Sequence, residues 1–176
     1  MTTATGPGST RDRVVAAAVA MTAETGWSGV TMGAVADRAG VSRQTVHHEV
    51  GTKHGLAEAM VREHVGFRSR WARQKMLYRD DRLLLYDDFV QAEKAILLSL
   101  MGLNRVYLPH LGFRWLDRLA ADLAIAPPNL AARVADVFRR PPAEAVAVLD
   151  ALIDETLCLV EQHMPQVEAQ AVRADF

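Results

Sequence analysis

Apolar residues recur at spacings of three and four along most of this chain, which is the period of an amphipathic helix. No stretch keeps the alternation of period two that marks a strand. Prolines fall between the periodic segments and mark where helices break. Besides the segment described next, we expect helices over 11–24, 53–65, 67–79, 87–103, 113–125, 129–140 and 142–163. The pattern therefore predicts an all-α fold.

Residues 31–53 predict two short helices joined by a tight turn. Thr31 is placed to cap a helix over Met32–Ala39, and Ser42 is placed to cap a second helix that begins at Arg43. Gly40, between them, best adopts the left-handed conformation of such a turn. A helix, a glycine turn and a second capped helix form the helix-turn-helix motif, whose second helix enters the major groove of DNA.

The spacing of small and apolar residues supports this interpretation. Ala36 lets the two short helices approach closely, and Val46 packs back between them. The outward side chains of the second helix are all able to form hydrogen bonds: Arg suits guanine, Gln suits adenine, and Thr or His suits phosphates or bases. These outward residues are Arg43, Gln44, Thr45, His47 and His48. The alternative is an ordinary helical hairpin with a polar face.

This stretch closely resembles the tetracycline-repressor (TetR) family of bacterial transcription regulators. The residues that carry the resemblance are Val30-Thr31-Met32, Ala36, Ala39-Gly40-Val41-Ser42, Thr45-Val46 and Gly51-Thr52-Lys53. The resemblance covers roughly residues 10–65. It implies a helix-turn-helix DNA-binding domain with a connecting helix over 10–66, and a helical domain that dimerises and binds a small effector over 67–176. We expect residues 1–9 to be a disordered tail.

Carried over residue by residue, the DNA contacts of the family agree with the outward positions. Thr31 would touch a phosphate, and the first residues of the second helix would face the groove. Lys53 would meet a phosphate at the first turn of the connecting helix, helped by the positive end of that helix. The expected DNA contact set is Thr31, Arg43, Gln44, Thr45, His47, His48 and Lys53.

Three residues depart from the family pattern. His47 stands where the family most often has Tyr, Val50 stands where Phe commonly packs behind the recognition helix, and Glu49 adds a negative charge. His47 and His48 are either cations that strengthen phosphate contacts or neutral hydrogen-bond donors. The departures leave an alternative open: a ligand-binding or interaction module of the same fold that has lost specific DNA binding.

Charge and cysteine content fit a DNA-binding protein of a reducing cytoplasm. Residues 1–79 carry 11 Lys or Arg against 6 Asp or Glu, and residues 80–176 carry 9 against 15. A basic amino-terminal half suits a polyanionic partner.

Cys158 is the single cysteine, so no internal disulfide forms, and we expect it to be a buried packing thiol. No apolar run is long enough to cross a membrane, and no export signal precedes the first helix.

The segment 142–164 carries a wide apolar surface. One stripe consists of Val146, Leu149, Ile153, Leu157, Val160 and Met164, and a second beside it consists of Ala145, Val148, Leu152 and Leu159. Such a surface can face both its own domain and a partner helix, although the alternative is a helix buried within one protomer. Because one recognition helix reads too few base pairs, we expect a homodimer on a palindromic operator with half-sites about 34–36 Å apart.

Effector and catalytic residues are harder to place. The candidates for an apolar effector cavity are Trp71, Met101, Tyr107, His110, Phe113 and Trp115, each of which is alternatively a core residue. A basic cluster consists of Arg68, Arg70, Arg73, Lys75 and Arg79, and it either neutralises flanking DNA or forms a solvated face. No cofactor, metal or nucleotide motif is present, so we expect no enzyme and no cofactor. The effector itself stays unidentified.

Overall fold

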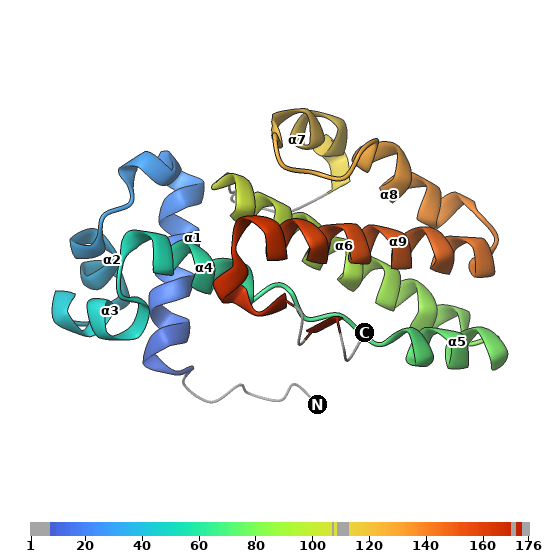
Figure 1. The fold of residues 1–176 in the computed structure, drawn as a ribbon, viewed down its shortest axis with the longest axis horizontal. Coiled ribbons are helices and arrows are strands. Elements are labelled where there is room, and N and C mark those ends of the chain that lie inside the picture. Colours follow the sequence, from blue (N-terminus) through green and yellow to red (C-terminus); the bar gives the residue numbers. More distant parts are fainter. Residues whose placement is uncertain (1–7, 107, 109–112, 170–171, 174–176) are drawn as a thin grey trace.

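A computed structural model describes residues 8–106, 108, 113–169 and 172–173, and within them the fold is all-α, as expected (Figure 1). The elements are α1 (Thr10–Gly29), α2 (Met32–Ala39), α3 (Arg43–Val50), α4 (Lys53–Arg62), α5 (Arg70–Tyr78), α6 (Arg82–Asn104), η1 (Phe113–Trp115), α7 (Leu116–Asp122), α8 (Leu130–Arg139), α9 (Pro142–His163) and η2 (Pro165–Val167). No helix in these described ranges is both long and apolar enough to span a membrane. Tyr107 and His110, two expected effector residues, lie outside the described residues.

The first helix begins and ends close to the expected positions. Its cap is Ser9, whose hydroxyl accepts from the backbone N–H of Asp12, while the Asp12 carboxylate accepts from the backbone N–H of Ser9. Gly26 has φ 73° and ψ 162°, which interrupts the helical backbone three residues before the helix ends. Arg38 of α2 then donates two hydrogen bonds of 2.6 Å to Glu24 and ties the second helix to the end of the first.

The helix-turn-helix prediction is confirmed in its local detail. Thr31 and Ser42 cap α2 and α3 through their side-chain oxygens, at 3.2 and 3.0 Å from the backbone nitrogens that they accept from. Gly40 is left-handed, with φ 66° and ψ 38°. Ala36 and Val46 are both buried, so the close approach and the packed valine are present.

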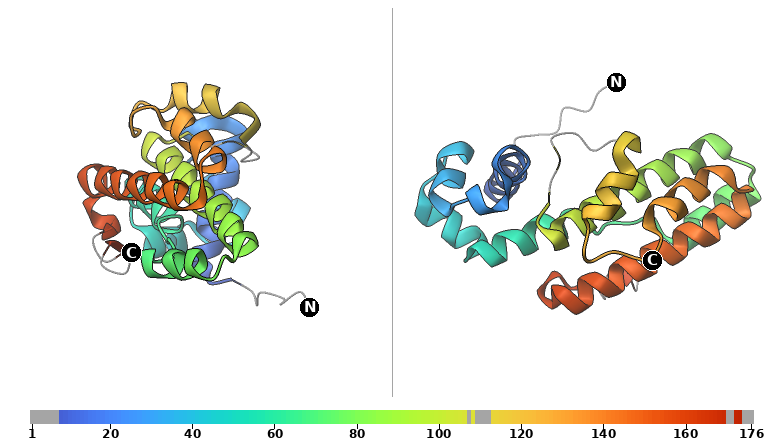
Figure 2. Two further views of the ribbon diagram at one scale, coloured as in Figure 1. Left: turned by 90° about the vertical axis from the view of Figure 1, so that its right-hand side faces the viewer. Right: turned by 90° about the horizontal axis from the view of Figure 1, so that it is seen from above.

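The carboxy-terminal half is a helical bundle in which α6 packs against α9 and α8 packs against α9. In Figures 1 and 2, α7 and α8 lie over the pair formed by α6 and α9. After α9, the chain turns back through η2 onto α4, where Arg62 donates a hydrogen bond to the carbonyl of Gln166. The connecting helix α4 therefore contacts α1 and α3 on one side and α6 and η2 on the other.

An ion-pair network centred on the buried Arg73 engages three residues of the arginine cluster, while Lys75 and Arg79 are exposed. Arg73 is fully buried, and it donates to Asp150 of α9 at 2.9 Å and to Asp88 of α6 at 3.2 Å. Arg68 donates to Asp88 at 2.9 Å, and Arg70 pairs with Asp154. These three arginines link α5 and the residues before it to α6 and α9; Arg73 is buried, whereas Arg68 and Arg70 are about half exposed.

The expected burial of Cys158 is wrong, whereas the expected partner-facing surface of α9 stays a prediction. All six residues of its first apolar stripe are buried within the protomer. In the second stripe Ala145 and Leu152 are buried, but Val148 and Leu159 are only half-buried. Cys158 is exposed, because it lies on the opposite side of α9 from the core, next to Leu157, which is fully buried. Ala147 is exposed on the same helix, Ala151 is half-buried, and the Cys158 sulfur accepts a hydrogen bond of 2.9 Å from Arg173.

Candidate nucleic-acid interface

The recognition helix α3 lies at one extremity of the molecule, beside α2 and far from α5 and the start of α9 (Figures 1 and 2). Arg43, Gln44, His47 and His48 are exposed, and their spacings of three and four place them on one face of the helix. Val46 lies on the opposite face and is fully buried. Since nothing in the described residues covers the polar face, four of the seven expected contact residues are available to a groove.

The two expected threonine contacts differ in their availability. Thr31 is exposed, and its hydroxyl oxygen accepts from the backbone of Ala34, which leaves the hydroxyl proton free to donate to a phosphate. Thr45 is half-buried, and its hydroxyl lies 2.7 Å from the hydroxyl of Ser42. Thr45 therefore supports the cap of α3 at least as directly as it faces the groove.

A hydrogen bond determines which nitrogen of His47 faces outward. The Nδ1 atom lies 2.7 Å from the carbonyl oxygen of Gly51, and a carbonyl only accepts, so Nδ1 carries the proton. In the neutral ring, the outward Nε2 is then an acceptor, and it becomes a donor only when the ring is a cation. His47 would therefore offer a phosphate a donor at Nε2 only in its charged form, and would offer an acceptor to an amino group of a base in its neutral form.

Lys53 is held against the end of α1. Its ammonium group donates to the carbonyl of Trp27 at 2.8 Å and lies 4.9 Å from the centre of the Trp27 ring. An ammonium group has three donors, so this contact leaves two for other partners. Thr52 caps the same helix through its hydroxyl at 3.1 Å from the backbone nitrogen of Gly55, next to the positive end of α4.

The structure accommodates the two departures at the end of α3. Val50 is buried and packs in the core, as the residue at this position must. The carbonyl of Glu49 accepts a hydrogen bond of 3.0 Å from Arg11 of α1, which places a positive charge at the negative end of α3. The smaller valine and the added acidic residue therefore leave the recognition helix anchored at its carboxyl end.

The turn between α3 and α4 is closely packed at one glycine. A Cβ atom placed on Gly55 would overlap the carbonyl oxygen of Val50. The backbone of α4 therefore approaches the end of α3 as closely as the absence of a side chain allows. This contact fixes the direction in which the connecting helix leaves the recognition helix.

The ion pair between α1 and α2 reduces the charge next to the interface. The Arg38 guanidinium holds the pKa of the Glu24 carboxyl below its ordinary value, mainly through their hydrogen bonds. Because each charge of this exposed pair offsets the other, Arg38 contributes little net field toward a polyanion. Arg43 and Lys53 are the cations that the expected contact set places nearest the groove and the backbone.

The described effector candidates come from three separate elements. Trp71 of α5 and Trp115 of η1 are 69 % and 61 % exposed, so neither indole forms an inner wall of this protomer. Met101 of α6 is fully buried. Phe113 of η1 is half-buried and contacts Phe138 of α8, with ring centres 6.3 Å apart.

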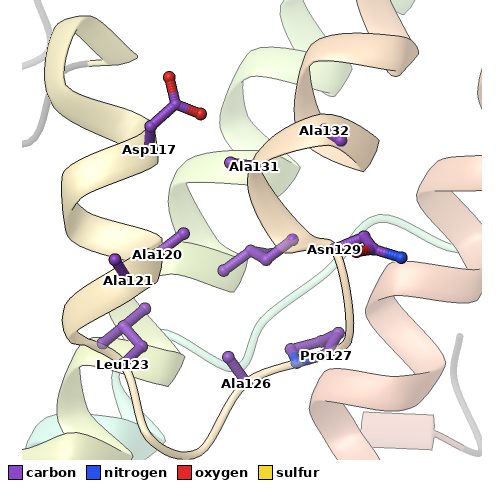
Figure 3. Close-up of a pocket in the computed structure, with 10 residues that line it drawn as sticks. Asp117, Ala120, Ala121, Leu123, Ala126, Pro127, Asn129, Ala131 and Ala132 are labelled. Atoms are coloured by element: carbon purple, nitrogen blue, oxygen red, sulfur yellow. The ribbon is translucent and has the colours of Figure 1, made fainter.

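A recess between α7 and α8 is the cavity drawn in Figure 3, with a volume of about 430 Å³. Alanine methyl groups and the side chains of Leu123 and Leu130 form most of its lining. Its polar side chains, Asp117 and Asn129, lie at opposite ends and do not converge (Figure 3). A ligand site needs a few polar groups that converge on one point, and this recess has none.

Sequence reasoning missed one polar residue of the bundle, Glu93 of α6. Glu93 is fully buried, and both of its carboxylate oxygens lack a hydrogen-bond partner among the described residues. The signal was present in the sequence, because a charged residue stands four positions after Phe89 and three before Ile96, on the apolar face of a helix.

Comparison with known proteins identifies the amino-terminal part of the chain. The sequence profile of the bacterial regulatory proteins of the tetR family matches residues 14–60, which run from α1 into α4. No curated protein matches the chain. One solved structure, titled "Molecular basis for control of antibiotic production by a bacterial hormones", is similar over 94 % of this chain and 92 % of its own, with 19 % sequence identity and a TM-score of 0.42.

Proposed function

We propose that this chain, whose residues 14–60 match the profile of the tetR-family bacterial regulatory proteins, is a homodimeric, ligand-responsive repressor that binds a palindromic operator. A DNA-binding transcription regulator is the function that the family match supports directly. The single observation that carries the proposal is the exposed polar face of α3, formed by Arg43, Gln44, His47 and His48. We assign DNA binding to residues 10–66 and effector binding and dimerisation to residues 67–176.

The dimer is proposed through the free side of α9. Ala147 and Cys158 are exposed, and Val148 and Leu159 are half-buried, so this side of α9 offers small and apolar side chains that a second helix could contact. A dimer places two copies of α3 on successive turns of one face of DNA, which multiplies the discrimination of each. A light-scattering mass of 19.3 kDa at micromolar concentration would contradict the dimer.

The connecting helix is the proposed route from effector to DNA. Its first turn holds Lys53 against Trp27 of α1, while the helix as a whole packs against α6 and η2. A ligand that favours one packing of α6 would shift α4 and change the distance between the two recognition helices α3 of the dimer. The ligand shifts that balance only by its difference in affinity for the two states.

Titration of the upstream intergenic DNA tests the proposal against the alternative of a module that no longer binds DNA. Fluorescence anisotropy at several salt concentrations should give an affinity that falls steeply as salt rises, together with a preference over a scrambled duplex. Binding without preference for sequence, or no binding, would favour the alternative. From the family match of residues 14–60 we also propose a cytoplasmic location and a regulatory rather than an enzymatic role.

A further inference from the structure

His47 and Gly51 hold each other at the carboxyl end of α3. The backbone N–H of Gly51 donates to the carbonyl of His47 at 2.9 Å, and the Nδ1–H of His47 donates to the carbonyl of Gly51 at 2.7 Å. Gly51 has φ 68° and ψ −85°, a backbone conformation that residues with a Cβ atom rarely adopt, and in this conformation its carbonyl meets the imidazole ring. The ring of His47 is therefore fixed in orientation and carries its proton on Nδ1.

The other ring nitrogen of His47 is left for a partner outside the protein. Among the described residues, the Nε2 atom of His47 has no hydrogen-bond or ion-pair partner, whereas the Nε2 atom of His54 lies 3.2 Å from the Glu58 carboxylate. No described carboxylate therefore holds a second proton on the ring of His47. The side chain is exposed on the same face of α3 as Arg43, so Nε2 is available to a molecule that lies against this face.

The fixed ring complements one kind of group on DNA. A neutral imidazole that is protonated on Nδ1 has an acceptor and no donor at Nε2. The oxygens of a DNA phosphate are acceptors too, so this form of the ring has no hydrogen bond to offer the DNA backbone. The base edges in the major groove include two donors, N6 of adenine and N4 of cytosine. The complementary partner is therefore an exocyclic amino group of a base.

We propose that His47 is a specificity-determining residue that accepts a hydrogen bond at Nε2 from the exocyclic amino group of an adenine or a cytosine. This inference rests on the DNA binding proposed above and assigns one base position of each half-site. It also gives Gly51 a positioning role, because the carbonyl of Gly51 selects the ring form that can read a base. His48 is the matched control, since it is exposed on the same helix and no hydrogen bond to the described residues fixes its ring.

Nitrogen NMR of the free protein tests the form of the ring. Proton–nitrogen correlation spectra would be recorded at about pH 8, where an ordinary histidine is neutral, and His47→Phe would assign the signals. His47 should carry its proton on Nδ1, whereas His48 should show the Nε2–H form or a mixture of the two forms. A neutral His47 ring that is protonated on Nε2 would overturn the proposal.

Removal of single amino groups from the operator tests the contact itself. Purine in place of adenine, or 2-pyrimidinone in place of cytosine, deletes only the exocyclic amino group. One such replacement in each half-site should lower the affinity of the wild-type protein on the order of 10-fold in fluorescence anisotropy, and the base replaced tells adenine from cytosine. His47→Phe should lose this sensitivity, whereas His48→Phe should keep it. The comparison of wild type with His47→Phe cancels the effect of the replacement on base pairing.

The possible failures have separate meanings. If every amino-group replacement affects wild type and His47→Phe alike, His47 contacts no amino group and the proposal is overturned. If His47→Phe weakens binding to operator and scrambled duplexes by the same factor, the ring contacts phosphate in its charged form, which also overturns the proposal. A protein that binds the operator and fails these tests keeps the proposed function and loses this inference, whereas a protein that binds no duplex loses both.

Discussion

The ammonium group of Lys53, at the start of α4, donates a hydrogen bond of 2.8 Å to the carbonyl of Trp27 and lies 4.9 Å from the centre of its ring. The contact joins the connecting helix α4 to the end of α1. It also fixes a positive charge beside the capped start of α4, next to the exposed hydroxyl of Thr52. A phosphate at this position would meet the ammonium group, the hydroxyl and the positive end of the helix together.

Loss of the Lys53 charge should weaken binding to all DNA sequences alike. We expect Lys53→Met to lower the affinity for operator and scrambled duplexes by similar factors and to reduce the salt slope by about one, because one phosphate contact is lost. Lys75→Met is the matched control, since Lys75 lies 4.7 Å from the centre of the Trp71 ring on the distant helix α5. An unchanged salt slope in Lys53→Met would show that this lysine does not contact phosphate.

The glycine at the α3–α4 turn should tolerate no side chain. Gly55→Ala places a Cβ atom against the carbonyl of Val50, and we expect it to lower the free energy of unfolding by about 1–3 kcal/mol. Gly33→Ala is the control within α2, where a Cβ atom meets nothing within 4 Å. The control should gain about 0.4–1 kcal/mol from the better helix propensity of alanine. Urea denaturation measures both, and equal effects of the two substitutions would contradict the close approach.

The buried arginine should be a major determinant of stability in the bundle. Arg73→Leu removes the cation that the buried Asp88 shares with the half-buried Asp150, which should cost about 3–5 kcal/mol. Arg82→Ala, which breaks an exposed pair with Asp80, should leave the free energy of unfolding nearly unchanged. Similar losses in the two variants would mean that the network of Arg73 contributes no more than a surface pair.

Glu93 should make the protein less stable as the pH rises. Burial raises its pKa from 4.5 to about 8, so between these values the unfolded chain has lost a proton that the folded chain keeps. The loss of folding stability caused by Glu93 is absent below the pKa of the unfolded chain and complete above the pKa of the folded protein. We therefore expect Glu93→Gln to gain roughly 3–5 kcal/mol relative to wild type between pH 5 and pH 9. A stability difference that does not change with pH would contradict the raised pKa.

Local signals in the sequence account for what could be predicted. The caps Thr31 and Ser42 and the left-handed Gly40 act within a few residues of one another, so their roles can be read directly. The apolar period predicts that α6 begins at residue 87, whereas the helix begins at Arg82 with Asp81 as its cap. The first turn carries the exposed Leu83 and Leu84, which do not follow the apolar period of the rest of the helix. Where a single local residue decides the structure, the expectation was close.

Interactions between distant segments could not be predicted. Arg73 and Asp150 are 77 positions apart, and nothing in the local pattern pairs them. Cys158 was expected to be buried because its neighbours are apolar, and only the placement of α9 against α6 and α8 decides which side of the helix is free. The contact between Arg11 and the end of α3, and the isolation of Glu93, depend in the same way on the assembled fold.

The central claim is that the exposed face of α3 reads an operator, and Arg43 tests it most directly. Fluorescence anisotropy with the operator and a set of its single-base-pair variants would be measured for wild type, Arg43→Ala and the control Arg139→Ala, an exposed arginine at the end of α8. We predict that Arg43→Ala loses about 1–3 kcal/mol of discrimination at one base position in each half-site, while Arg139→Ala keeps the wild-type profile. A base-preference profile for Arg43→Ala identical to that of wild type would contradict the claim.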